Sequence, residues 1–312
     1  MLTTFITTLW QMLSLMLVLI IGYILNKLKV IPKSGESVMS KLITNVFLPA
    51  LTMYTFLTEC TPENLRTYGT LPLYGLAVFL TSMGIGYLLG KPFGKGNSYL
   101  EGIYRYLFTH PNTGGIGTPL VLAMFGTAGY FRFSLFLLSG TAICYTWGVQ
   151  QITPKSAGHR GWKVLFSLIN PIFIAMLIGA ILGLCGVGSL LPPVIPDMLQ
   201  KIGGCYTIVS LILCGYVIAD FDIKTLLNDP KVYLFTALRL LILPLIYLGA
   251  AKLLNLSELL CTMICLTVAC PAGMNTVVYP VAYGEDTRPG ASILLVSTVF
   301  SVLTVPFLYA LI

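Results

Sequence analysis

Long apolar segments separated by short polar breaks dominate the hydrophobic pattern of this chain. Each segment is about as long as a helix needs to cross the hydrocarbon core of a bilayer, roughly 20 residues. Only helices and closed barrels satisfy their own backbone N–H and C=O groups in lipid. The pattern therefore predicts an all-α integral membrane protein with ten transmembrane helices, at 5–26, 37–57, 71–90, 102–125, 130–150, 165–186, 202–219, 232–251, 257–283 and 288–311.

The composition excludes a water-soluble globule. Hydrophobic residues make up 56% of the 312 residues and charged residues only 9%, with a mean hydropathy of +0.89. That leaves too few polar groups to cover a soluble surface of this size. The first apolar segment lacks the basic region and small-residue cleavage site of a signal peptide and is longer than its apolar core, so we interpret it as the first span.

The distribution of lysine and arginine predicts the orientation in the membrane. Basic residues gather in or beside the first, third and fifth loops, and loops of this kind face the cytoplasm. Both termini are then extracellular, in a multi-pass protein of the cell membrane. The net charge of +7 does not indicate nucleic-acid binding, because no soluble basic domain accompanies it. The basic residues in or beside the first, third and fifth loops are Lys27, Lys29, Lys33, Lys41, Lys91, Lys95, Arg105, Lys155, Arg160 and Lys163.

A weak internal repeat divides the chain into halves. The stretch LIIGYIL at 19–25 recurs as LIGAIL at 177–182, and each copy opens a group of five predicted spans. Because five is odd, the second copy enters the membrane from the opposite side, which is a common architecture for alternating access. We expect a first repeat at 1–150, a cytoplasmic linker at 151–164 and a second, inverted repeat at 165–312.

Two of the predicted spans, the fourth and the ninth, are interrupted. Pro111 and Pro119 bracket three glycines in span four, and Pro271 and Pro280 bracket a similar stretch in span nine. Proline removes a backbone donor and clashes with the preceding turn, and glycine eases departure from helical geometry. Irregular backbone at that depth is tolerated where it lines a cavity, and half-helix N-termini there favour an anion. The alternative is that these residues only kink or pack the helices.

Several motifs together resemble one known family. They are GYILNKLKVIP at 22–32, SKLITNVFLPAL at 40–51, N-T-G-x-x-G-x-P at 112–119, NPIFIAMLIGAILG at 170–183, PAGMNTVVYPVAYG at 271–284 and STVFSVLTVP at 297–306. With them, nearly the whole chain resembles bacterial members of the auxin efflux carrier family, relatives of the plant PIN transporters in the bile acid/arsenite/riboflavin transporter superfamily.

The resemblance implies both an architecture and an activity. Spans one, two, six and seven would form a scaffold, and spans three to five and eight to ten a transport domain whose crossover helices are spans four and nine. It also implies an elevator-type motion, a homodimer, and the transport of a small organic anion, such as auxin or a mono- or dicarboxylate, across the plasma membrane.

The family pattern also suggests a substrate site. Its crossover asparagines map to Asn112 and Asn275, with Thr113, Gly114 and Thr276 beside them. An amide binds a carboxylate without placing a second charge in the membrane. The plant carriers have an ionisable group in span three, whereas residues 71–90 contain no Asp, Glu, Lys, Arg or His, so a similar charge-coupling mechanism does not follow.

Two ionisable residues inside predicted spans, His110 and Arg239, are candidates for a functional role. His110 precedes the first break, and its imidazole suits either proton coupling and anion contact or a structural hydrogen bond to a freed carbonyl. Arg239 lies about two turns inside span eight, where a fixed charge is costly unless it faces a cavity, snorkels to the interface or meets a partner. A substrate carboxylate or a helix end is the candidate partner for Arg239.

Other functional classes find less support in the sequence. The eight cysteines form no CxxC pair and no histidine stands at metal-ligand spacing, so we expect neither metal nor cofactor. No H-E-x-x-H, G-x-S-x-G or paired intramembrane aspartates indicate an enzyme. An anion channel and a sodium-coupled symporter of the bile acid type remain as alternatives. Saturable counter-transport would distinguish a carrier from the channel, and sodium dependence would identify the symporter.

Overall fold

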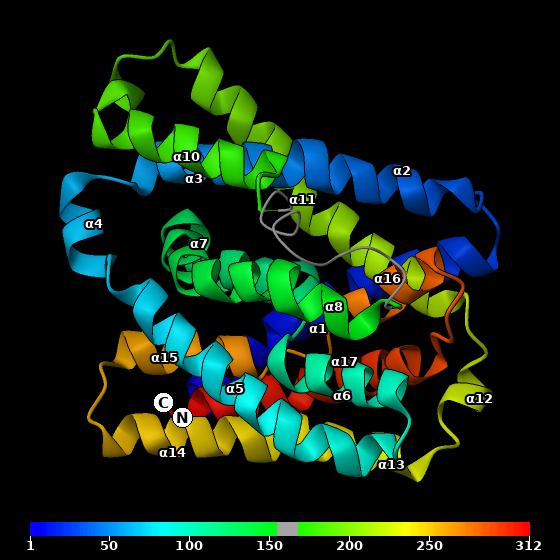
Figure 1. The fold of residues 1–312 in the computed structure, drawn as a ribbon. Helices are drawn as coiled ribbons and strands as arrows, with labels where there is room; N and C mark the ends of the chain where they lie inside the picture. The colour runs from blue at the N-terminus through cyan, green and yellow to red at the C-terminus, as the bar shows by residue number, and fades with distance from the viewer. Residues whose placement is uncertain (155–167) are drawn as a thin grey trace.

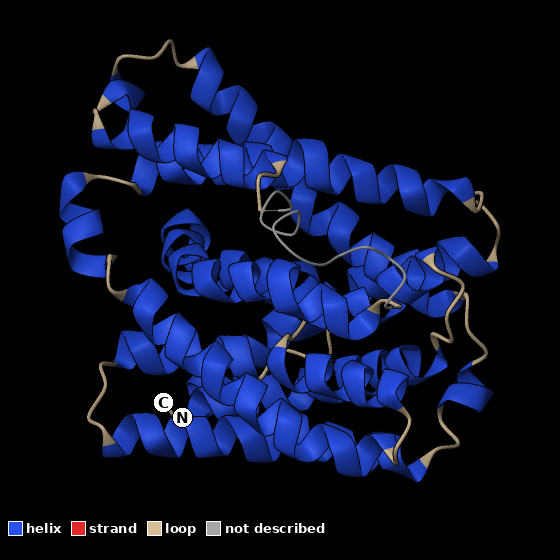
Figure 2. Cartoon of the chain, viewed as in Figure 1, coloured by secondary structure: helices blue, strands red, loops and turns tan. Residues whose placement is uncertain are grey.

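The computed structural model describes residues 1–154 and 168–312, and this part of the chain is helical without a named β-strand (Figure 2). Six helical stretches in it are long and apolar enough to cross a membrane. They are Leu2–Lys27, Pro62–Gly94, Thr113–Ile152, Val194–Ala219, Pro230–Leu253 and Arg288–Ala310, and the shorter apolar helices Pro171–Leu184 and Glu258–Val268 accompany them. The all-helical membrane class predicted from the sequence is confirmed at this level.

The stretches correspond to the predicted spans with identifiable differences. Predicted spans 102–125 and 257–283 are interrupted helices, so neither forms one long element. The second arm of span four and all of span five lie within the single stretch Thr113–Ile152. Gly126 divides that stretch, because its φ of 62° and ψ of −158° are not helical. Only glycine adopts such backbone angles readily.

The first half of the chain contains eight α-helices and three wider turns of π-helix among its described residues. In order they are α1 (Leu2–Lys27), α2 (Ser34–Leu42), η1 (Ile43–Phe47), α3 (Leu48–Glu59), α4 (Pro62–Tyr68), α5 (Leu71–Gly94), α6 (Ser98–Thr109), η2 (Thr113–Gly117), α7 (Thr118–Ile143), η3 (Cys144–Gly148) and α8 (Val149–Ile152). The predicted linker 151–164 falls mostly outside the described residues, apart from its first four.

The described part of the second half runs from α10 to α17. Its described elements are α10 (Pro171–Leu184), η5 (Val187–Ser189), α11 (Val194–Ala219), α12 (Ile223–Leu226), α13 (Pro230–Ala237), η6 (Leu238–Ile242), α14 (Leu243–Leu253), α15 (Glu258–Val268), α16 (Asn275–Ala282) and α17 (Arg288–Ala310). Three of the π-helical turns, η1, η2 and η6, stand directly before a helix whose second residue is proline: Pro49, Pro119 and Pro244. A wider turn relieves the clash between the proline ring and the carbonyl one turn earlier.

Close helix packing joins α1, α3, α10 and α11, which derive from the four spans predicted as scaffold. In Figure 1, α3 and α10 lie side by side, and α1 packs against α11. Glycines allow the backbones to approach: a Cβ on Gly22 would lie 2.1 Å from the carbonyl oxygen of Ile212, and one on Gly183 would lie 2.5 Å from that of Phe56. Small residues at such contacts are typical of helix association in membranes.

The remaining helices surround the two interrupted spans. α5 packs against α6 and α7, α14 against α15, and α17 against α13, η6 and α1. Side-chain caps fix where several of these helices begin: Asn97 accepts from the N–H groups of Tyr99 and Leu100 at α6, and Ser257 accepts from Leu260 at α15. These caps satisfy backbone donors that have no partner inside the helix. Both capped helices lead directly to an interruption.

Candidate functional site

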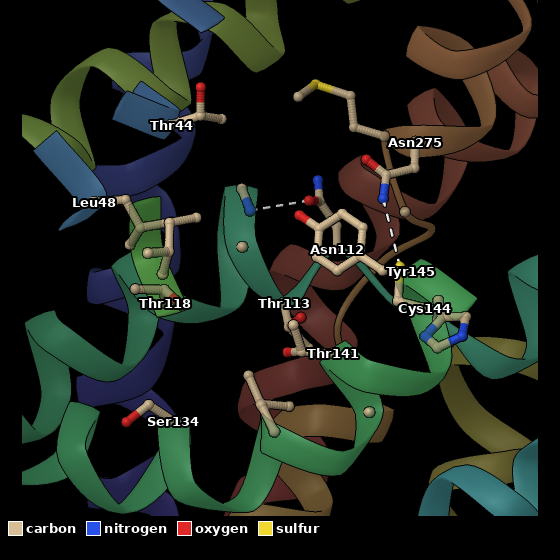
Figure 3. A pocket seen from close by; sticks show the side chains of 18 of the residues that line it. Thr44, Leu48, Asn112, Thr113, Thr118, Ser134, Thr141, Cys144, Tyr145 and Asn275 are labelled. Carbon is tan, nitrogen blue, oxygen red and sulfur yellow. Dashed lines mark hydrogen bonds between the residues drawn. The ribbon is translucent and has the colours of Figure 1, made fainter. Parts of the chain in front are cut away.

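A cavity of about 690 Å³ lies where the two interrupted spans face α3, α10 and α11. Its wall is mostly apolar, with hydroxyl, amide and thiol groups interspersed (Figure 3). Among the described lining residues, Glu36 contributes a carboxyl group and His110 an imidazole. The described lining includes no lysine or arginine. A cavity of this size holds a small organic molecule.

The first interruption separates α6 from η2 and exposes Asn112 to the cavity. The backbone of His110 is extended, and helical geometry resumes at Thr113. Asn112 caps the new helix, because its Oδ1 accepts a hydrogen bond from the N–H of Gly115 at 3.0 Å. Its Nδ2 contacts only the thiol of Cys214 among the described side chains, at 4.0 Å. The amide donor of Asn112 is therefore weakly engaged within the protein.

The second interruption runs from Ala269 to Met274, between α15 and α16. Asn275 starts α16 and donates from Nδ2 to the hydroxyl of Tyr106 at 2.8 Å. The same Nδ2 lies 3.8 Å from the Sγ of Cys144, and Figure 3 shows the amide oxygen turned away from this contact. Both predicted asparagines thus line one cavity, although each belongs to a different half of the chain.

The two interruptions cross in direct backbone contact. Pro111 and Ala272 form an antiparallel bridge, and the N–H of Asn112 donates to the carbonyl of Pro271 at 2.8 Å. Gly273 lies against this contact, since a Cβ there would lie 2.8 Å from the carbonyl oxygen of His110. The crossing therefore depends on a glycine and on two prolines that leave helical geometry.

The other residues predicted for the site occupy different surroundings. Thr113 and Gly114 line the cavity, and the carbonyl of Gly114 accepts from the Tyr206 hydroxyl at 2.6 Å. Thr276 is fully buried, donates to the carbonyl of Gly273 at 2.9 Å, and is absent from the cavity wall.

The four predicted helix-breaking prolines also differ from one another. Pro111 and Pro271 lie in the interruptions, whereas Pro119 stands in the first turn of α7 and Pro280 lies inside α16. Because η2 runs directly into α7, the wider turn before Pro119 accommodates its ring, and in the short helix α16 the backbone tolerates one missing bond.

His110 lies in the cavity wall among aromatic rings. Its imidazole stacks on Phe79 at a centroid distance of 5.6 Å and contacts Tyr106 at 4.9 Å. The Nε2 atom is buried and has no hydrogen-bond partner among the described residues. A nitrogen buried this deeply gains a partner only from an ordered water molecule or from a rearrangement that opens it to the cavity.

Arg239 lies on the other side of the crossing and does not line the cavity. It is 1% exposed, and its guanidinium donates from Nε to the carbonyl of Leu107 at 3.1 Å and from Nη1 to the carbonyl of Val268. These carbonyls belong to the last turns of α6 and α15. Arg239 therefore contacts two helix ends, and not a group that lines the cavity.

Sequence reasoning missed several polar residues of the cavity wall. Tyr106 and Cys144 contact Asn275, and the hydroxyl groups of Thr52 and Tyr130 lie 3.1 Å apart. No local pattern distinguishes Thr52 and Cys144 from the other hydroxyl and thiol groups of apolar spans. The tyrosines, among them Tyr106 and Tyr206, do carry a signal, because a tyrosine hydroxyl buried in an apolar span requires a polar partner.

One carboxyl group lies in the cavity wall at the start of α2. Burial raises the pKa of Glu36, and the nearby carboxylate of Asp220 raises it further. Asp220 itself accepts a hydrogen bond from Asn26 at 2.8 Å. A carboxyl group with a raised pKa carries less negative charge near the cavity than an ordinary glutamate.

Comparisons with known proteins agree with this architecture. The profile of the membrane transport protein family matches the chain over residues 7–163 and again over 159–309, in accord with two related halves. A protein of Methanothermobacter thermautotrophicus described as an uncharacterized transporter is 23% identical over 295 residues, which cover 94% of this chain and 95% of that protein. The chain therefore belongs to the membrane transport protein family, that of the auxin efflux carriers, and is a multi-pass membrane transporter.

Proposed function

We propose that this protein is a secondary transporter that moves a small organic anion across the plasma membrane. The observation that carries the proposal is the position of both crossover asparagines, one from each half, in the wall of one cavity. The helices that begin at Thr113 and at Asn275 direct the partial positive charge of their N-termini toward the same region. An anion gains from this field without a cationic side chain in the wall.

The chemistry of the cavity favours some anions over others. Phe79, Leu137, Leu138, Ile172 and Met176 supply apolar surface, which suits a solute with a hydrocarbon or aromatic part. The polar contacts are two amides, hydroxyl groups and an imidazole, and they compensate one carboxylate better than two. We therefore expect monocarboxylates with an apolar body to bind more tightly than compact dicarboxylates.

Transport by alternating access accounts for the packing of the helices in two groups, one of them α1, α3, α10 and α11 and the other around the two interrupted spans. In this scheme ten spans form an inverted repeat, and α1, α3, α10 and α11 belong to a scaffold through which the protein dimerises. The crossing moves with the helices around it as a transport domain, in an elevator-type motion. The Pro111–Ala272 contact supports such a unit, because it ties the two interrupted spans together.

Ligand-induced thermal stabilisation of the purified protein tests the proposal. The panel comprises acetate, lactate, malonate, malate and indole-3-acetate, applied to the wild type, Asn112→Ala, Asn275→Ala and the control Asn228→Ala. Asn228 is exposed and lies outside the cavity wall. We expect at least one acid to stabilise the wild type and the control. The crossover variants should bind it about tenfold or more weakly, because a hydrogen bond to a charged group contributes roughly 1.5–3 kcal/mol.

The outcomes separate the competing functions. If no acid stabilises the wild type, or if both crossover variants respond like the control, the anion site is wrong. Proteoliposomes loaded with the bound acid then distinguish a carrier from an anion channel, since only a carrier exchanges the acid across the membrane with saturation. Stabilisation or uptake that requires sodium would replace the proposal by a sodium-coupled symporter.

A further inference from the structure

Two helices end at the crossing with their C-termini close together. α6 ends at Thr109 and α15 at Val268, and both chains leave helical geometry within the next residues. The last four carbonyls of a helix have no partner inside it, and together they represent about half a negative charge. Two such ends next to the cavity oppose the positive N-termini that begin at Thr113 and Asn275.

Arg239 joins these two ends with one side chain. Its guanidinium donates to Leu107 in the last turn of α6 and to Val268 at the end of α15. The two acceptors come from different halves of the chain and are 161 residues apart in sequence, from 268 − 107. The planar guanidinium group, with five N–H donors in a fixed arrangement, suits two diverging acceptors better than an ammonium group of the same charge.

The surroundings leave the helix ends as the main compensation for this charge. Arg239 is 1% exposed and forms no ion pair in the described part of the chain. Burying a cation without compensation is strongly unfavourable. The carbonyl oxygens of two helix C-termini supply partial negative charge at hydrogen-bonding distance, so the cation and the helix ends stabilise each other.

We propose that Arg239 is a positioning residue that fixes the crossing and neutralises its two negative helix ends, so that the positive N-termini determine the potential felt by an anion in the cavity. Arg239 does not touch the solute. This role of Arg239 explains how the cavity retains anions although the described part of its wall lacks lysine and arginine. This inference rests on the proposed anion transport, and it adds the source of the favourable potential.

The first experiment compares Arg239→Met with Arg239→Lys, which keep similar unbranched stems and differ in charge. Arg132→Met is the control, because the Arg132 guanidinium stacks on Tyr68 at 4.7 Å, away from the cavity wall. Binding of acetate, lactate and indole-3-acetate is measured on protein that elutes as a single species. We expect about tenfold weaker binding for Arg239→Met, a smaller loss for Arg239→Lys and none for the control. Equal binding by Arg239→Met and the wild type would overturn the proposal.

The second experiment does not depend on any anion. In Arg239→Ala the space left by the removed side chain admits free guanidinium. The guanidinium is added at concentrations far below those that unfold proteins. Guanidinium should raise the melting temperature of this variant and not that of the wild type, whereas urea, which has a similar shape and no charge, should raise neither. Equal rescue by urea would show that Arg239 acts by filling space, and no rescue by guanidinium would equally overturn the role proposed for its charge. If no acid binds the wild type, only the anion function fails, and this second result still decides the role of the charge.

Discussion

Gly215 permits the closest approach between α1 and α11, and its replacement gives the sharpest test of the packing. A Cβ at this position would lie 1.9 Å from the carbonyl oxygen of Leu19 and 2.9 Å from the backbone nitrogen of Tyr23. Gly204, in the same helix, has no atom within 4 Å of the corresponding point. Alanine at either position gains the same helix propensity, so a comparison of Gly215→Ala with Gly204→Ala isolates the contact between helices.

The geometry gives the expected magnitude. A carbon atom approaches a carbonyl oxygen to about 3.3 Å, so α1 and α11 must separate locally by roughly 1.4 Å to admit the new methyl group. Overpacking of this kind costs about 1–3 kcal/mol. Because the obstructing atoms belong to the backbone of α1, rotation of a side chain cannot relieve the clash. We expect Gly215→Ala to be less stable than Gly204→Ala by at least this amount.

Thermal denaturation in detergent, followed by size-exclusion chromatography of the fraction that remains folded, measures the difference. Gly204→Ala should melt at or slightly above the wild-type temperature, because alanine is favoured over glycine in a helix by about 1 kcal/mol. Gly215→Ala should melt clearly below it. Equal melting temperatures for the two variants would refute the argument, since they would mean that α1 and α11 do not pack as described.

Two further predictions concern the groups around the cavity. Because the pKa of Glu36 is raised in the native state by burial and by Asp220, the native state retains this proton to higher pH than the unfolded chain, and stability falls as pH rises through the raised pKa. Asp220→Asn should reduce that fall as the pH rises above the ordinary glutamate pKa of about 4.3, measured as melting temperature; an unchanged profile would contradict the assignment of Asp220 as a cause. Cys144 lines the cavity, so in a variant whose exposed Cys185 and Cys205 are replaced by serine, a small thiol reagent should modify Cys144 more slowly when a panel acid is bound. A rate independent of that acid would place the acid elsewhere.

The sequence supported the helical class, the family and the positions of the interruptions for local reasons. Pro111 and Pro271 each remove a helical donor, and hydrophobic length reports a membrane span. The resemblance to auxin efflux carriers is confirmed by the match of the family profile to both halves. The domain division, the site roles and the dimer stay predictions.

Features that depend on long-range contacts could not be predicted from local sequence patterns. The bond between Asn112 and Pro271 joins backbone atoms, which carry no residue signature. For Arg239 the sequence left several partners open, because a backbone carbonyl is equally available at any residue. A local signal can also mislead. Pro280 was expected to break a helix but lies inside α16, because a proline interrupts a helix only where surrounding contacts hold the altered backbone.

The backbone contact between Pro111 and Ala272 has a consequence for the origin of such a chain. Each half leaves peptide groups unpaired at its own interruption, and lipid offers them no hydrogen bonds. A protein made of one half alone would have to associate with a second copy that supplies the missing hydrogen bonds before either could be stable in a bilayer. Fusion of two such copies into one polypeptide makes that association intramolecular, and it allows a single residue, such as Arg239, to serve both copies at once.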